Sequence, residues 1–135
     1  KRTFTHSSEF VLWFVKGKNW IFNYNDVKKF NPNKTLKGED KQMRDFLDFI
    51  ELPIVQGKER LRNEDGRALH PTQKPEKLLE LIVLASSNKG EIVLDPFFGT
   101  GTTGYVAQRL GRKWIGIETN KKYINAAKER LKYVF

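Results

Sequence analysis

The stretch that decides the fold is Asp95-Pro-Phe-Phe-Gly99-Thr-Gly101-Thr-Thr-Gly104, a glycine-rich loop between an apolar run and a helical pattern. The preceding run, residues 91–95, predicts a short buried strand. Residues 102–110 predict a helix that ends at Gly111. Glycines let the backbone approach a ligand closely, and the helix N-terminus that follows offers unpaired N–H groups to an anionic group. The order of strand, loop and helix therefore predicts a ligand-binding loop.

A second strand pattern, residues 113–118, ends in the carboxylate of Glu118. An acid at this place can accept hydrogen bonds from two ribose hydroxyls, so the loop and the acid together favour a nucleoside ligand. The glycine spacing fits the dinucleotide fingerprint, but Asp95 is better placed for an ammonium group than for a pyrophosphate. A phosphate-binding P-loop is excluded, because no Lys follows the last glycine. The structural alternative is a tight turn with an exposed Glu118.

Helical patterns flank both strands. Pro75 and Glu76 suit the first turn of a helix that runs through Leu84. A last helix is capped by Thr119 or Asn120. The order helix, strand, helix, strand, helix predicts parallel strands in an α/β sheet.

The first half of the chain is organised differently. Residues 9–15 predict a strand covered on both faces, and residues 20–22 a returning strand after a turn at 16–19. The charged stretch that follows predicts loops, with one amphipathic helix near residues 40–50. The sequence thus divides into a hairpin at 1–24, a basic loop-rich segment at 25–69 and a glycine-loop part at 70–135.

Composition narrows the function classes. The 135 residues include 25 Lys and Arg against 16 Asp and Glu, a net charge of +9, which suits a phosphate-bearing partner. The absence of cysteine excludes a disulfide scaffold and a thiol nucleophile, and two histidines are too few for a histidine-built metal site, so we expect no metal. No apolar run could span a bilayer and no signal peptide opens the chain, which favours a reduced, cytoplasmic setting.

The segment His70-Pro-Thr-Gln-Lys-Pro75, followed about twenty residues later by the glycine loop, resembles the amino-group DNA methyltransferases of the permuted type. The resemblance covers residues 53–135 and extends more loosely to the hairpin. It implies an α/β fold with a partial, Rossmann-like methyltransferase sheet and part of the target-recognition region. The implied parent enzyme moves a methyl group from S-adenosylmethionine to the exocyclic amine of adenine or cytosine in double-stranded DNA, as in restriction-modification.

The same resemblance implies a set of site residues. The loop would hold the methionine part of S-adenosylmethionine, with Asp95 facing its amino group, and Glu118 would take the ribose hydroxyls. Lys74 or a nearby hydroxyl would meet the methionine carboxylate. The implied cofactor-binding residues are His70, Thr72, Lys74, Asp95, Phe97, Phe98, Gly99, Gly101, Thr102 and Glu118.

One family motif is missing. The catalytic tetrapeptide, D/N/S-P-P-Y, does not occur in the sequence. Asp95-Pro-Phe-Phe resembles it but is already part of the glycine loop. We therefore expect no catalytic residue in this chain, no activity from the 135 residues alone, and a longer parent protein that carries the motif upstream.

The basic segment predicts DNA contacts, which we assign to Lys58, Arg60 and Arg62. A long irregular insertion is usually functional or disordered, and a DNA methyltransferase must hold DNA while the target base is flipped. A solvated surface loop is the alternative. Three other interpretations stay open: a non-catalytic cofactor- or DNA-binding remnant, a dinucleotide oxidoreductase fragment and a structural nucleic-acid-binding module. The sequence also leaves a homodimer open.

Overall fold

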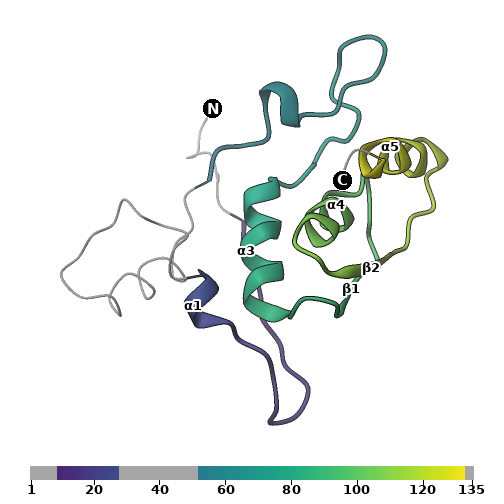
Figure 1. Ribbon diagram of the computed structural model, residues 1–135. Coiled ribbons are helices and arrows are strands. Elements are labelled where there is room, and N and C mark those ends of the chain that lie inside the picture. Colours follow the sequence, from purple (N-terminus) through teal and green to yellow (C-terminus); the bar gives the residue numbers. More distant parts are fainter. Residues whose placement is uncertain (1–8, 28–51, 133–135) are drawn as a thin grey trace.

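A computed structural model describes residues 9–27 and 52–132 (Figure 1). The predicted helix near residues 40–50 lies outside these ranges. Among the described residues, no helix is long and apolar enough to cross a membrane. The elements in chain order are α1 (Tyr24–Val27), the 3-10 turn η2 (Gly57–Glu59), α3 (Glu76–Ser86), β1 (Ile92–Asp95), α4 (Thr102–Arg109), β2 (Lys113–Gly116) and α5 (Lys121–Leu131).

The centre of the fold is a parallel pair of strands. Ile92 of β1 pairs with Lys113 of β2, and Asp95 pairs with Gly116. The connection between them runs through α4, which lies between α3 and the sheet in Figure 1. Val106 and Ala107 of α4 are completely buried there. The predicted α/β arrangement is confirmed.

The two faces of this sheet differ. Val93 and Trp114 are half-buried on the face that carries α4. Side chains alternate along a strand, so the neighbouring residues point to the opposite face. That open sheet face consists of side chains that are 51–60% exposed: Ile92, Leu94, Ile115 and Ile117.

The ring of Phe98 supports the glycine loop from beneath. It stacks on Trp114, with 5.2 Å between the ring centroids and 13° between the planes. A Cβ at Gly104 or Gly116 would collide with the Phe98 ring. The glycines at these positions therefore let the loop sit close to the sheet.

Side chains from other segments cap both ends of α3. At its start, Oε1 of Glu59 accepts a hydrogen bond from the N–H of Glu76 at 2.7 Å. At its end, Nδ2 of Asn23 donates to the carbonyls of Leu84 at 3.0 Å and Ser87 at 2.9 Å. The ends of a helix lack intrahelical partners, so these bonds fix both the length and the position of α3.

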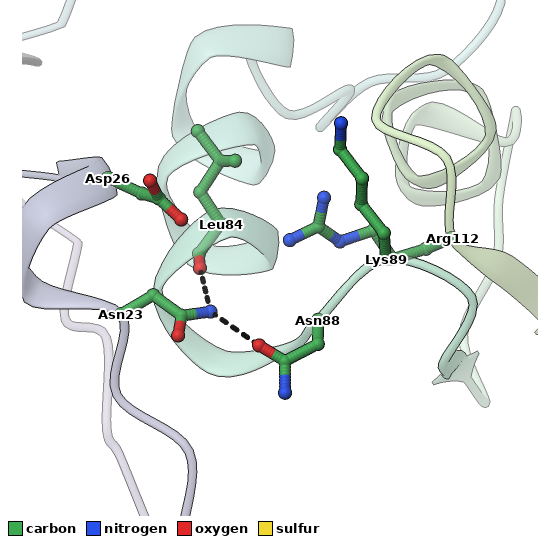
Figure 2. Close-up of a pocket in the computed structure, with 6 residues that line it drawn as sticks. All are labelled: Asn23, Asp26, Leu84, Asn88, Lys89 and Arg112. Atoms are coloured by element: carbon green, nitrogen blue, oxygen red, sulfur yellow. Dashed lines mark hydrogen bonds between the residues drawn. The ribbon is translucent and has the colours of Figure 1, made fainter.

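The buried side chain of Arg112 completes this capping at the amino end of the sheet. Its guanidinium donates to the carbonyls of Ser87 at 2.6 Å and Leu110 at 2.7 Å, and to the Ser87 hydroxyl at 3.2 Å. Figure 2 shows the cavity beside it, about 450 Å³ in volume. The cavity is lined by Asn23, Asp26, Leu84, Asn88, Lys89 and Arg112.

The predicted N-terminal hairpin is wrong in its strands. The chain reverses at Gly17, which has a φ of 79°, and the rings of Trp13 and Phe22 lie 5.1 Å apart. Within the described ranges, however, only β1 and β2 are strands. The arms carry exposed apolar side chains, Phe10 and Phe14 among them, and two strands without a covered face are not stable in water.

The segment before α3 is more ordered than predicted. Residues 61–69 form a short hairpin in which the N–H of Leu69 donates to the carbonyl of Leu61 at 2.9 Å. The buried Gln73 binds the start of the hairpin and the end of η2: its oxygen accepts from the N–H of Leu61, and its nitrogen donates to the carbonyl of Glu59. Gln73 therefore fixes the hairpin against the start of α3.

Candidate functional site

Three segments distant in sequence meet at Gly99. Nε2 of His70 lies 3.3 Å from the position that a Cβ on Gly99 would take. The N–H of Gly99 donates to Oε2 of Glu118 at 2.8 Å. Gly99 has a φ of 53°, in the left-handed region that favours glycine. The segment at 70–75, the glycine loop and the acid after β2 thus converge on one point at the carboxyl end of the sheet.

The Glu118 carboxylate is held by backbone donors. Its Oε1 accepts from the N–H groups of Thr119 and Asn120, both at 2.8 Å. The Asn120 bond, together with those from Gly99 and Thr119 and the charge of His70, lowers the pKa of Glu118 below its ordinary value, against the opposing effect of burial. Each carboxylate oxygen accepts about two hydrogen bonds, so only Oε2 keeps an acceptor position. Glu118 is therefore ionised, oriented and able to accept one more donor.

Asp95, at the end of β1, is a second fixed carboxylate. Its Oδ1 accepts from the N–H of Phe97 at 2.9 Å, and its Oδ2 accepts from the hydroxyl of Thr103 at 2.5 Å. Both oxygens retain an acceptor position. The side chain is half-buried, so it presents negative charge beside the loop from a single orientation.

The two phenylalanines of the loop lie on opposite sides of it. Phe97 is 89% exposed, whereas Phe98 is buried against Trp114. The exposed ring offers an apolar surface at the loop, while the buried ring supports the loop from within. A direct ligand contact stays a prediction for both, and the geometry favours Phe97.

The end of the loop is tightly packed. Gly101 has a φ of 79°, and a Cβ there would lie 2.9 Å from the Cβ of Ala127 on α5. Thr102, the first residue of α4, is buried, and its Oγ1 accepts from Arg130 at 3.0 Å. The end of the loop, where α4 begins, therefore packs directly against α5.

The residues of the 70–75 segment take different directions. The N–H of Thr72 donates to Nδ1 of His70 at 3.2 Å, and Nε2 of the same ring faces the loop at Gly99. Lys74 instead pairs with Glu9, 2.6 Å between Nζ and Oε2, in an exposed position. The geometry brings His70 to the site and directs Lys74 toward the N-terminal segment.

Sequence patterns missed two residues that touch the predicted set. The ring of Tyr123 lies 4.6 Å from that of His70, at an angle of 52°. Arg130 reaches Thr102 from the same helix, α5. Tyr123 lies on the apolar stripe of α5 and Arg130 among its charged residues, so no pattern distinguishes either from ordinary helix positions.

The three basic residues predicted to contact DNA are not equivalent. Lys58 is exposed in η2. Arg60 is half-buried and donates to the carbonyl of Val55 at 2.9 Å. Arg62 is exposed and donates to the carbonyl of Gly66 at 2.7 Å, across the hairpin at 61–69. Lys58 and Arg62 remain accessible to a phosphate, while Arg60 stabilises the local fold.

Residues 1–129 match the protein family described as DNA methylase. The chain belongs to the DNA methylase family. This match confirms the family resemblance predicted from the 70–75 segment and the glycine loop that follows it.

Named relatives of this DNA methylase chain are about equally similar to it. The Type II methyltransferase M.HinfI of Haemophilus influenzae is 44% identical over 133 residues, which are 97% of this chain and 34% of that relative. The Type II methyltransferase M2.LlaDCHI of Lactococcus lactis subsp. cremoris is also 44% identical over 133 residues, with 96% of this chain and 44% of the relative covered. The chain thus spans less than half the length of these relatives.

Solved structures also align with part of the DNA methylase chain. The M1.HpyAVI–SAM complex is 50% identical, with a TM-score of 0.45 over 47% of this chain and 33% of that chain. The cytosine-N4-specific PvuII DNA methyltransferase is 39% identical, with a TM-score of 0.44 over 45% of this chain and 22% of that chain.

Proposed function

We propose that this chain is the cofactor-binding part of a DNA methyltransferase, which moves a methyl group from S-adenosylmethionine to the exocyclic amine of adenine or cytosine. The observation that carries the proposal is the convergence of His70 and Glu118 on Gly99. Membership of the DNA methylase family supports the reaction class. The D/N/S-P-P-Y tetrapeptide is absent, so we assign no catalytic residue to this chain.

The donors and acceptors of the site fit S-adenosylmethionine. Asp95 has acceptor capacity for an ammonium group, and Oε2 of Glu118 has a position for a ribose hydroxyl. Because Gly99 has no side chain, the His70 ring can pack directly against the loop, 3.3 Å from the position that a Cβ would take. Glu118 accepts one hydroxyl with its backbone bonds intact, and a second only if one of these bonds breaks. The cofactor, when bound, supplies a methyl group activated by a positively charged sulfur.

The residues of this chain bind and orient rather than react. The carboxylates of Asp95 and Glu118 are fixed by backbone and hydroxyl donors, so they need no reorganisation when a ligand arrives. His70, whose ring packs at a tilt against that of Tyr123, borders the glycine loop on one side. Such fixed groups favour a single orientation of the methyl group, which is the main contribution that positioning makes to a direct transfer.

We further propose that double-stranded DNA approaches over η2 and the hairpin at 61–69. This hairpin leads directly into His70, so the exposed Lys58 and Arg62 lie on the segment that enters the site. Contacts of this kind bind phosphates and position the duplex without reading its sequence. The cytoplasmic setting and the homodimer stay predictions.

The test compares two carboxylates at opposite ends of the sheet. Glu118→Gln and Glu91→Gln make the same chemical change, and Glu91 also accepts a backbone bond, from the N–H of Asn88 at 2.6 Å. Titration calorimetry with S-adenosylhomocysteine should show about ten- to a hundredfold weaker binding for Glu118→Gln and less than about twofold for Glu91→Gln.

Two outcomes would contradict the proposal. No heat from the unsubstituted chain, or tight binding of NADH in its place, would reject the cofactor class. Equal losses in the two variants, with both folded by circular dichroism, would reject Glu118 as the ribose acceptor.

A further inference from the structure

Arg130 of α5 is the most enclosed cation of an ionic network between three helices. Its side chain is 7% exposed. Nη1 donates to Oγ1 of Thr102 at 3.0 Å, and Nη2 donates to Oε1 of Glu76 at 2.6 Å. The guanidinium carbon lies 4.9 Å from the ring centre of Tyr105 on α4. Both ends of the fork and one face of its plane are therefore held.

The two residues that Arg130 binds begin the helices that follow the two proposed cofactor-binding segments. Thr102 follows the glycine loop directly and begins α4. Glu76 follows the 70–75 segment directly and begins α3, where its N–H is held by Glu59. A single guanidinium thus joins the first residues of the two helices that follow these segments.

An arginine is suited to this task because its donors lie in a rigid plane. The fork fixes two acceptors at a set separation, whereas an ammonium group on a flexible stem fixes neither distance nor angle. Burial strengthens the link, since water does not compete for these bonds. Glu76 neutralises the charge, so Arg130 does not act as a free cation at the site.

We propose that Arg130 is a positioning residue for the cofactor, one that holds the glycine loop and the 70–75 segment at the spacing that lets His70 and Gly99 face each other. The inference rests on the proposed function, since it assumes that these segments bind S-adenosylmethionine. Arg130 acts through Thr102 and Glu76 and does not itself touch the ligand.

Arg109 provides a matched control. It pairs with the same Glu76 at 3.5 Å, lies 5.7 Å from the ring centre of the same Tyr105 and also binds Glu80 at 3.4 Å. Its side chain is 40% exposed and, within the described structure, makes no hydrogen bond with Thr102. Arg109 shares the ionic network but not the link to the glycine loop.

The experiment measures the affinity of the 135-residue chain for S-adenosylhomocysteine by calorimetry, well below the melting temperature of every variant. Arg130→Met should weaken binding about tenfold or more, and Arg130→Lys about threefold or more, because one ammonium cannot serve both acceptors. The affinity of Arg109→Met should stay within about twofold of that of the unsubstituted chain, even if its melting temperature falls as far as that of Arg130→Met. A purely structural arginine would lower the melting temperature without changing the affinity of the folded molecules.

Each outcome either supports or overturns the role proposed for Arg130. Unchanged affinity in folded Arg130→Met, or an equal loss in Arg109→Met, overturns the inference and leaves the proposed function intact. If Arg130→Met does not fold, Arg130→Lys decides alone, and unchanged affinity there overturns the inference. No binding by the unsubstituted chain overturns the proposed function, and the inference with it.

Discussion

The two ends of the β1–β2 sheet are both polar, but they use their polar groups differently. At the amino end, Arg112 and Asn23 donate to the last carbonyls of α3 and to the turn before β2. At the carboxyl end, Asp95 and Glu118 accept from the backbone and from one hydroxyl, and both keep acceptor positions. The polar groups of one end are used to hold the fold together, whereas those of the other end keep acceptor positions, which is the basis for proposing a ligand there.

This difference is informative because the cavity of Figure 2 lies at the amino end. The carboxyl end is distinguished by its remaining hydrogen-bond acceptor positions, and not by the volume of a cavity. At the carboxyl end, Gly99 is buried between the His70 ring and the Glu118 carboxylate, and its N–H is bonded to Glu118. The comparison makes predictions for each end separately.

The largest loss of stability should come from the amino end. Arg112→Met removes three hydrogen bonds, among them the side-chain bond to the Leu110 carbonyl, so the free energy of unfolding should fall by about 3 kcal/mol. The neighbouring Lys113 is exposed, and Lys113→Met should change it by less than about 0.5 kcal/mol. Urea denaturation measures both values. A loss of cofactor affinity in folded Arg112→Met, measured by calorimetry, would contradict the division between the two ends.

The strongest effect on affinity should come from a matched pair of glycines. Gly99 and Gly111 both have positive φ values, 53° and 76°, so alanine strains each of them. Only at Gly99 would the new Cβ meet His70; at Gly111 the nearest atom is a flexible lysine carbon 3.8 Å away. Gly99→Ala should weaken S-adenosylhomocysteine binding about tenfold or more, and Gly111→Ala less than about twofold. Similar affinities for the two variants in calorimetry would speak against a ligand at Gly99.

Sequence periodicity was sufficient for the local elements of the second half. The strands β1 and β2, the helices α3, α4 and α5 and the meeting of Gly99 with Glu118 follow from apolar spacing, glycines and the order of strands. The fit of Phe98 beneath the loop did not follow, because it depends on glycines in two other elements.

Long-range side-chain contacts explain the remaining differences. Gln73, Glu59 and Arg130 look like surface residues in the sequence, yet each bonds to a segment at least twelve positions away. The N-terminal arms have the apolar run of a strand that is covered on both faces, but they form no ladder, because pairing needs a partner and a covered face that no local pattern supplies. Local sequence therefore predicts elements better than it predicts their partners.

DNA affinity should depend on the basic residues near the carboxyl end. The double change of Lys58 and Arg62 to Ala should lower the slope of log K against log salt by about 0.9 for each lost phosphate contact. The matched double change of Lys89 and Lys113 removes the same charge from the amino end and should leave the slope unchanged. Titrations with duplex DNA at several salt concentrations test this. Equal slopes for the two double variants would mean that the hairpin at 61–69 is only a solvated surface loop without DNA contacts.

The smallest effect concerns pH. The pKa of Glu118 is lowered in the folded chain, so its contribution to stability is present above its ordinary value of 4.5 and is lost as the pH falls through the folded value. Denaturation at a series of pH values below 4.5 should show a steeper loss for the unsubstituted chain than for Glu118→Gln. Parallel curves would mean that the three backbone bonds do not favour the ionised form.

The most direct test of the central claim is the pattern of amide chemical shifts when S-adenosylhomocysteine is added to the 15N-labelled chain. The account predicts large changes at Gly99, Thr119 and Asn120, whose N–H groups bind Glu118, and none at Asn88 or Arg112. Changes confined to the amino end, with Gly99 unaffected, would place the ligand in the cavity of Figure 2 and contradict the account.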